Sequence, residues 1–224
     1  MSLPARTYMV CVGISDYPGV QNDLRVSAND AKTMSGIFTK NRKAEVCCFV
    51  NSAVTTQKVC AAMRQTFAKA TASDAIILYF SGHGIPGGLV CYDGFLYYSS
   101  ILNIMKQSKA KQKMIFVDAC FAGKMRNTNR RNYNYSNENV MFFLSSRSTE
   151  TSLETPRQTG FNNSLFTVFL ERGLRGGADV NRDRTVTAKE IYDFVHKGVV
   201  QASGGRQHPV MWGKFDDNMP IIRW

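Results

Sequence analysis

Short apolar runs alternate with amphipathic stretches along this chain, and this alternation limits the possible folds more than any other feature of the sequence. The apolar runs are rich in β-branched and aromatic residues, which is typical of strands. They lie at 8–14, 44–50, 75–80, 113–119 and 139–146. Between them, apolar residues recur at the spacing of one helical face, as at Ala28, Ala31, Met34, Ile37 and Phe38. This order predicts an α/β domain with a mostly parallel sheet.

Helices are expected at 28–40, after a cap at Thr55 or Thr56, from about Ser99, at 164–174 and at 187–200. The segment GGLVCYDGFLYY is typical of a small hairpin with Asp93 and Gly94 in its turn. The tail 208–224 can add an edge strand, which would complete a six-stranded sheet flanked by helices on both faces. No repeat or linker interrupts residues 1–224, so we expect one domain with a full core.

The net charge is +11, from 28 Lys and Arg against 17 Asp and Glu. These basic residues are spread along the chain rather than interleaved with aromatic residues on one element, so we expect a solvated surface and no nucleic-acid partner. No run approaches about 18 apolar residues, and we expect no membrane partner. The start, MSLPARTYMVCVGI, lacks the pattern of a secretory leader. Cytoplasm, or export with a leader outside this sequence, both stay open, and so does the oligomeric state, with a monomer favoured.

Two of the expected strands end in segments that carry reactive side chains. AIILYFSGHG places His83 between glycines just after one strand, and MIFVDAC places Cys120 at the end of another. Because ligands bind beyond the carboxyl ends of parallel strands, thiol and imidazole face each other across one crevice if those strands are neighbours. A histidine can take the proton of a cysteine and then protonate a leaving amine. The backbone N–H groups of Gly84 and Cys120 are candidates for binding the developing oxyanion.

The same residues carry a family resemblance. YFSGHG, with its histidine 37 positions before the cysteine of DAC, resembles the motifs of the caspase-like cysteine peptidases (clan CD, peptidase C14 type). It is closest to the metacaspases and their bacterial relatives, the orthocaspases. VGISDY, LRVSANDA and FLSSRSTETSLE extend the likeness over nearly the whole chain. The resemblance implies a caspase-like fold and a cysteine endopeptidase that needs no cofactor and acts on proteins or peptides.

The resemblance also implies a basic preference. Animal caspases carry glutamine two positions before the nucleophile, whereas this chain has Asp118 there. A carboxylate beside the nucleophile disfavours the thiolate, so we assign Asp118 to the pocket for the residue that precedes the scissile bond. Asp30 matches the second pocket carboxylate of metacaspases, Ser81 matches their pocket serine, and Ser27 occupies a position that is often cysteine in them. Such a pocket predicts cleavage after Arg or Lys.

The segment 123–139 is rich in asparagine and basic residues and poor in residues that pack, which predicts an exposed loop. It offers the preferred kind of residue just after the nucleophile, where related proteases are cut into large and small fragments. We therefore predict self-processing at one or more of Lys124, Arg126, Arg130 and Arg131.

Other interpretations stay open. In the simplest alternative, Cys120 is a buried inert thiol, Asp30 braces its helix, and Asp118 binds loop amides. The chain would then be a catalytically silent binding module with this fold, or a clan CD peptidase with another preference. His196 and His208 lack the flanking glycines and the preceding strand, so neither is expected to be the base. The thiols within strand and helix patterns are expected in the core: Cys11, Cys48 and Cys60.

The segment DVNRDRTVTAKE has oxygen-bearing side chains at the spacing of a calcium loop: Asp179, Asn181, Asp183, Thr185 and Glu190. The position that is glycine in such a loop is Arg184 here. We therefore favour a polar turn in which Thr187 and Glu190 form a capping box, with calcium as the weaker alternative.

Overall fold

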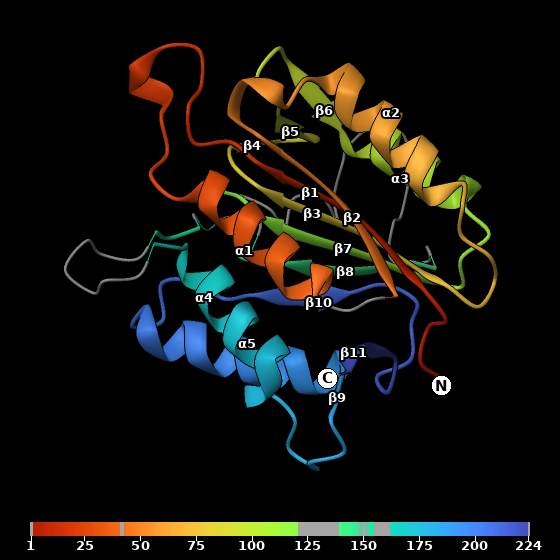
Figure 1. The fold of residues 1–224 in the computed structure, drawn as a ribbon. Coiled ribbons are helices and arrows are strands. Elements are labelled where there is room, and N and C mark those ends of the chain that lie inside the picture. Colours follow the sequence, from red (N-terminus) through yellow and green to blue (C-terminus); the bar gives the residue numbers. More distant parts are fainter. Residues whose placement is uncertain are drawn as a thin grey trace.

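The computed structural model describes residues 2–40, 43–120, 139–147, 150, 152–154 and 162–223. Its centre is a six-stranded sheet in the order β10-β8-β7-β3-β1-β2 (Figure 1). The parallel strands are β1 (Thr7–Gly13), β2 (Ala44–Val50), β3 (Ala75–Ser81), β7 (Gln112–Asp118) and β8 (Met141–Leu144). The edge strand β10 (Val210–Trp212) lies antiparallel to β8. The mostly parallel six-stranded sheet, including its edge strand from the tail, is confirmed.

The middle strands set the place where ligands can bind. Every residue of β1 and β3 is buried, because helices cover both faces of the sheet, and this explains their continuous apolar sequence. The register pairs Gly13 with Ser81, and Ser81 with Asp118. The carboxyl ends of β1, β3 and β7 therefore lie level at one edge, where the segments that follow them come together.

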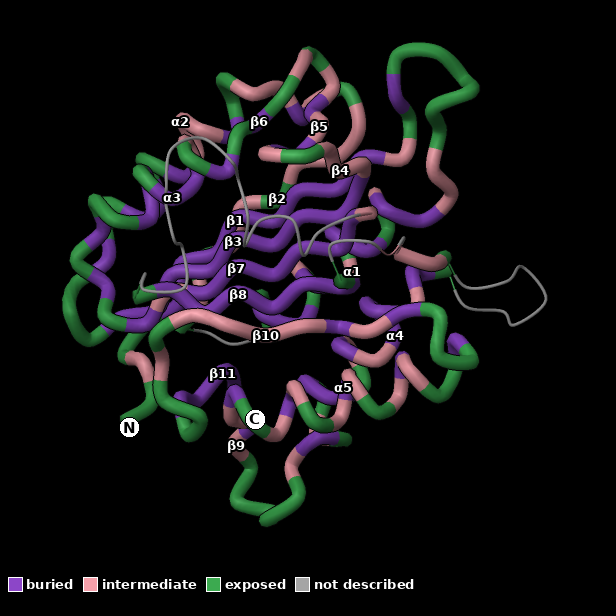
Figure 2. The backbone as a smooth tube through the Cα atoms, turned by 180° about the vertical axis from the view of Figure 1, so that it is seen from behind, coloured by how far each residue is buried: buried purple, intermediate pink, exposed green. Residues whose placement is uncertain are grey.

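The helices divide between the two faces of the sheet (Figure 1). One face is covered by α1 (Ser27–Thr39), α4 (Leu165–Arg172) and α5 (Ala188–Ala202), and the other by α2 (Thr56–Phe67) and α3 (Tyr98–Gln107). Strand residues alternate between the two cores, so that Met9 packs with α1 and Val10 with α2. Figure 2 shows the buried backbone concentrated in these strands and the exposed backbone in the outer loops.

Smaller elements complete the fold. The predicted hairpin is present as β5 (Gly88–Val90) and β6 (Phe95–Tyr97), and β4 (Gly84–Ile85) pairs with β5 as a third antiparallel strand. A second small sheet pairs β9 (Thr185–Thr187) with β11 (Pro220–Arg223). The described residues also include the helical turns η1 (Val20–Asn22) and η2 (Asn51–Ala53), and a π-helical turn, η6 (Gly173–Gly177), after α4.

Helix caps follow the sequence expectations. The Thr55 side chain caps α2 by accepting from the backbone N–H of Lys58. At the start of α5, Thr187 and Glu190 form the predicted capping box. Cys11 is fully buried as expected, but the prediction for Cys48 was wrong, since its position on the edge strand β2 leaves it exposed. In the described part of the chain, every helix is too short or too polar to cross a bilayer.

Candidate active site

One pocket opens at the carboxyl ends of β3 and β7. His83 lies two residues beyond β3, Cys120 lies two residues beyond β7, and both line this pocket. The free space in and at the mouth of this pocket, open solvent included, is about 310 Å³. Its other lining residues come from five segments: Leu24, Ser27, Ser81, Gly82, Asp118, Ala119, Ser152, Leu153, Glu154 and Ser164. The structure thus brings the thiol and the imidazole to one solvent-open cleft, with Cys120 partly exposed.

The imidazole of His83 is held by a backbone carbonyl that sequence reasoning missed. Its Nε2 lies 2.7 Å from the carbonyl oxygen of Asn22, in the turn η1. A carbonyl only accepts, so Nε2 carries the hydrogen and donates it. The other ring nitrogen, Nδ1, is then left to accept a proton. No side-chain pattern identifies Asn22, because the contact uses only its backbone.

Gly84 lies against the backbone of Cys120. A Cβ at Gly84 would stand 2.5 Å from the Cys120 carbonyl oxygen, so only glycine fits here. The N–H of Val90 donates to the His83 carbonyl at 3.0 Å, which makes this a hydrogen-bonded pair of the β4–β5 ladder. Hydrogen-bonded and open pairs alternate in an antiparallel ladder, so the N–H of Gly84 turns away from β5. This N–H therefore takes no part in the β4–β5 ladder.

Asp118, the last residue of β7, presents a buried carboxylate to the pocket. The hydroxyls of Ser152 and Ser164 donate to it in short hydrogen bonds, and Thr167 Oγ1 donates at 3.0 Å. Burial raises the pKa of Asp118, and these hydrogen bonds oppose the rise. None of the three donors was predicted, since they come from segments far along the chain.

Asp30 lies one layer behind the pocket. It is fully buried on α1, receives the Ser81 hydroxyl at 2.8 Å, and accepts from Asn163 Nδ2 and the Ser164 N–H, both at 2.9 Å. Burial, and then the negative charge of Asp118, raise the pKa of Asp30 to about 8. At neutral pH Asp30 therefore keeps its proton, and a cation bound in the pocket would favour its ionisation.

The rim of the pocket contains one acidic residue that sequence reasoning missed. Glu154 lines the pocket, and its Oε1 accepts from the backbone N–H groups of Arg25 and Val26 at 2.7 and 3.1 Å. Its other oxygen lies 3.6 Å from the Arg25 guanidinium. Ser27, predicted to line the pocket, does so at the first position of α1.

Comparison with known proteins agrees with this geometry. A family profile described as Caspase domain matches residues 6–219. The chain belongs to the caspase-domain family. No curated protein matches the chain. Among solved structures, it is similar to a protein from Geobacter sulfurreducens, with 17% identity, a TM-score of 0.71 and 97% of each chain covered.

It is also similar to caspase-1 from Spodoptera frugiperda, with 17% identity, a TM-score of 0.69, and 94% of this chain and 87% of that chain covered. At such identity these two structures show a caspase-like fold and say nothing of specificity. A caspase domain is a cysteine-peptidase domain, which suggests this class of activity for the chain.

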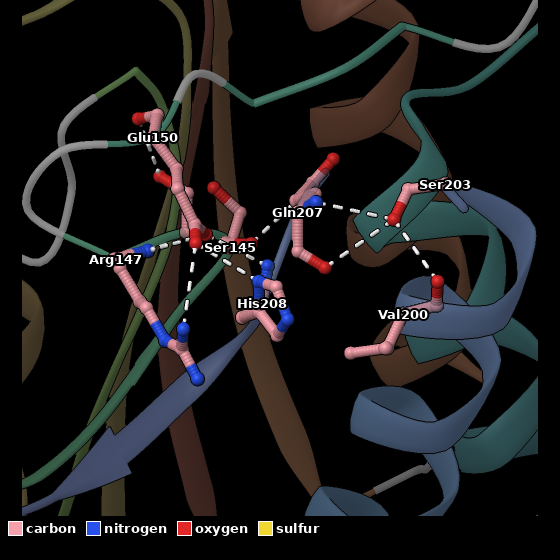
Figure 3. A network of polar contacts seen from close by, with 8 residues as sticks. Ser145, Arg147, Glu150, Val200, Ser203, Gln207 and His208 are labelled. Carbon is pink, nitrogen blue, oxygen red and sulfur yellow. Dashed lines mark hydrogen bonds and ion pairs between the residues drawn. The ribbon is translucent and has the colours of Figure 1, made fainter. Parts of the chain in front are cut away.

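In this caspase domain, Gln207 and His208 follow α5 and lie close to Ser145 and Glu150 (Figure 3). The Gln207 side chain is fully buried, donates to the Ser145 carbonyl at 2.8 Å, and accepts from the Leu153 N–H at 2.9 Å. His208 Nδ1 lies 2.9 Å from Glu150 Oε1. Burial acts to raise the pKa of Glu150, but hydrogen bonds from His208 and from the backbone of Arg147 lower it overall. His208 thus braces a loop, and it is absent from the pocket lining.

The other predicted sites lie in the basic segment 123–139 and in the calcium-like segment 179–190. Residues 123–138, with Lys124, Arg126, Arg130 and Arg131, lie outside the described residues. The Glu190 carboxylate is bonded to the N–H and hydroxyl of Thr187, at 3.0 and 2.8 Å, as the capping-box interpretation predicts. Among the residues that the structure describes, no cluster of three or more His, Cys, Asp or Glu side chains is arranged to hold a metal ion.

Proposed function

We propose that this caspase domain is a cysteine endopeptidase that cleaves after Arg or Lys, as in the metacaspase and orthocaspase branch of the family. The proposal depends on one observation: His83, Cys120 and the buried carboxylate of Asp118 line the same pocket. The thiol is the nucleophile and the imidazole is the base, and the buried carboxylate favours a basic side chain in the pocket.

In the proposed reaction, His83 Nδ1 takes the proton of Cys120, and the sulfur attacks the carbonyl carbon of the substrate. The N–H groups of Gly84 and Cys120 bind the oxyanion of the tetrahedral intermediate, a contact typically worth roughly 3 to 4 kcal/mol. The imidazolium then protonates the leaving amine, and a thioester remains on Cys120. Water, deprotonated by His83, releases the product and restores the thiol. Each step moves a proton or an acyl group and needs no cofactor.

The preference for Arg and Lys follows from the negative charge of the buried Asp118 carboxylate. An Arg or Lys side chain that reaches Asp118 forms a charge-assisted hydrogen bond. It also opposes the burial and the repulsion from Asp118 that keep a proton on Asp30. An acidic side chain in the same pocket would add a further negative charge to this pair, which is costly away from water.

Hydrolysis of four otherwise identical fluorogenic peptides, ending in Arg, Lys, Asp or Asn, tests this function. We expect kcat/KM for the Arg and Lys peptides to exceed that for the Asp peptide by at least about 10³-fold, from a charge contact worth roughly 4 kcal/mol. Turnover of the Asp peptide alone would overturn the pocket assignment. Turnover of none of the four would favour a catalytically silent binding module.

We further propose that the enzyme cuts its own chain between residues 123 and 139. The support is chemical: Lys124, Arg126, Arg130 and Arg131 present the preferred side chain close to Cys120 in sequence. Mass spectrometry of active protein is expected to show fragments ending at one or more of these residues, and Cys120→Ala protein is expected to stay whole. An intact segment in fully active enzyme would rule self-processing out.

A further inference from the structure

Tyr17 packs against the loop after β3 that carries His83, here called the histidine loop, and contacts it through its hydroxyl and its ring. Its side chain is nearly fully buried, at 5% exposure. Its hydroxyl oxygen accepts the backbone N–H of His83 at 2.9 Å, and its own hydrogen is directed at the Val90 carbonyl, 3.2 Å away. The two rings lie 4.8 Å apart between centroids, tilted by 45°. One side chain therefore binds the backbone of His83, covers its imidazole, and ties both to β5.

The packing around this hydroxyl leaves no spare room. A Cβ at Gly82 would stand 2.5 Å from the Tyr17 hydroxyl oxygen, so the histidine loop rests directly on it. Burial raises the pKa of Tyr17 far above that of a free tyrosine. The hydroxyl therefore keeps its proton throughout any practical assay range, and can accept from His83 and donate to Val90 at the same time.

Tyr17 is also linked to the group that holds the imidazole. Its backbone N–H donates to Asp23 Oδ1 at 3.0 Å. Asp23 directly follows Asn22, whose carbonyl accepts from His83 Nε2. The N–H of Leu24 donates to the Ser15 carbonyl at 2.8 Å and closes this short loop. The Tyr17 hydroxyl that binds the His83 backbone and the Asn22 carbonyl that binds its ring thus belong to one hydrogen-bonded unit, residues 15–24.

We propose that Tyr17 is a positioning residue, which, with Asp23, holds His83 as the Nε2–H tautomer with Nδ1 directed at the pocket. This inference rests on the proposed peptidase function and adds to it the source of the histidine's orientation. Without the hydroxyl, the N–H of His83 loses its acceptor and the loop loses its tie to β5. The imidazole is then free to turn away from the Asn22 carbonyl, and a misplacement of about 1 Å can cost about a hundredfold in rate.

The test replaces Tyr17 by Phe, which keeps the ring and removes only the hydroxyl. We expect kcat for the Arg peptide to fall about 10- to 100-fold, with KM changed by less than about twofold, because the pocket residues are untouched. The chain has only three histidines, so nitrogen NMR of histidine-labelled protein can be assigned with single substitutions. His83 is expected to give the signals of a fixed Nε2–H tautomer in the wild type and averaged signals in Tyr17→Phe.

The matched control is Tyr98→Phe. Tyr98 is as well buried, and its hydroxyl has no hydrogen-bond partner among the described residues, so both readouts should match the wild type. If Tyr17→Phe does not fold, Asp23→Ala tests the same unit and should shift kcat and the tautomer signals in the same direction. Unchanged tautomer signals in a folded variant would overturn the proposal. Because the NMR readout needs no turnover, this failure is distinct from a failure of the proposed peptidase function.

Discussion

Replacement of Cys120 by Ala is expected to lower kcat for the Arg peptide by at least about 10⁴-fold, since removal of a nucleophile leaves only binding and oxyanion contacts to accelerate the reaction. The thiol lies in a turn beyond β7 and is partly exposed, so its loss should change the free energy of unfolding by less than about 0.5 kcal/mol. Steady-state kinetics and a thermal melt of the same sample measure both quantities.

Cys48→Ala is the matched control, because it removes an exposed thiol from the edge strand β2, away from the pocket. It should retain full activity. Alkylation by iodoacetamide offers a second reading: the residue that is modified as activity is lost should be Cys120. Wild-type turnover by the Cys120→Ala variant would remove that residue from its role.

Replacement of Asp118 by Asn is expected to lower kcat/KM for the Arg peptide by about 10²- to 10³-fold, because a buried partner charge is worth roughly 3 to 4 kcal/mol to a bound cation. Asn keeps the size of the side chain and one acceptor for the hydroxyls of Ser164 and Thr167. Hydrolysis of an Asn peptide, which carries no charge, should change much less. The ratio of kcat/KM for the Arg peptide to kcat/KM for the Asn peptide therefore separates charge recognition from damage to the site.

Asp193→Asn serves as the control for net charge. It removes one carboxylate on α5 that forms an exposed ion pair with Lys189, a contact worth at most about 0.5 kcal/mol. Its ratio of kcat/KM for the Arg and Asn peptides should equal that of the wild type. A similar loss in both variants would mean that overall charge, rather than the pocket, selects basic substrates.

The buried carboxyl groups at this pocket should make KM for the Arg peptide depend on pH. Because burial and the charge of Asp118 raise the pKa of Asp30 to about 8, we expect binding of an Arg side chain between pH 6 and 8 to release a proton. KM for the Arg peptide is therefore expected to fall by up to about tenfold per pH unit over that range, and Asp30→Asn should flatten this slope. An unfolded Asp ionises near pH 4, so the free protein also loses stability as pH rises from about 4 to about 8. A slope unchanged in Asp30→Asn would contradict this assignment.

Much of this caspase domain follows from the sequence alone. Strands such as β3 are continuous apolar segments, and the α5 cap is a local pattern of Thr187 and Glu190, so neighbouring residues determine them. His83 and Cys120 could be placed at one edge because each lies just beyond the end of its strand, and parallel strands end together. The close approach of Gly84 to the backbone of Cys120 was also a reasonable expectation, since a glycine next to the histidine permits it.

The supporting residues could not be predicted in this way. The Asn22 carbonyl that holds the imidazole is a backbone group, and every residue has one. The donors to Asp118 come from Ser152, Ser164 and Thr167, whose sequence separation from it says nothing about contact. Asp30 was expected to line the pocket with Asp118, but in the structure it lies one layer behind, through Ser81.

The sequence by itself determined which side chains can do chemistry and at which end of the sheet they lie, because strand pattern and chain direction are local properties. Only the tertiary structure decided what surrounds them: which nitrogen of His83 carries the hydrogen, how many donors Asp118 has, and where the proton of Asp30 resides. These depend on burial and on partners brought from distant segments. Electrostatic energies in a buried site are set by such neighbours within a few ångströms, and a linear sequence does not list them.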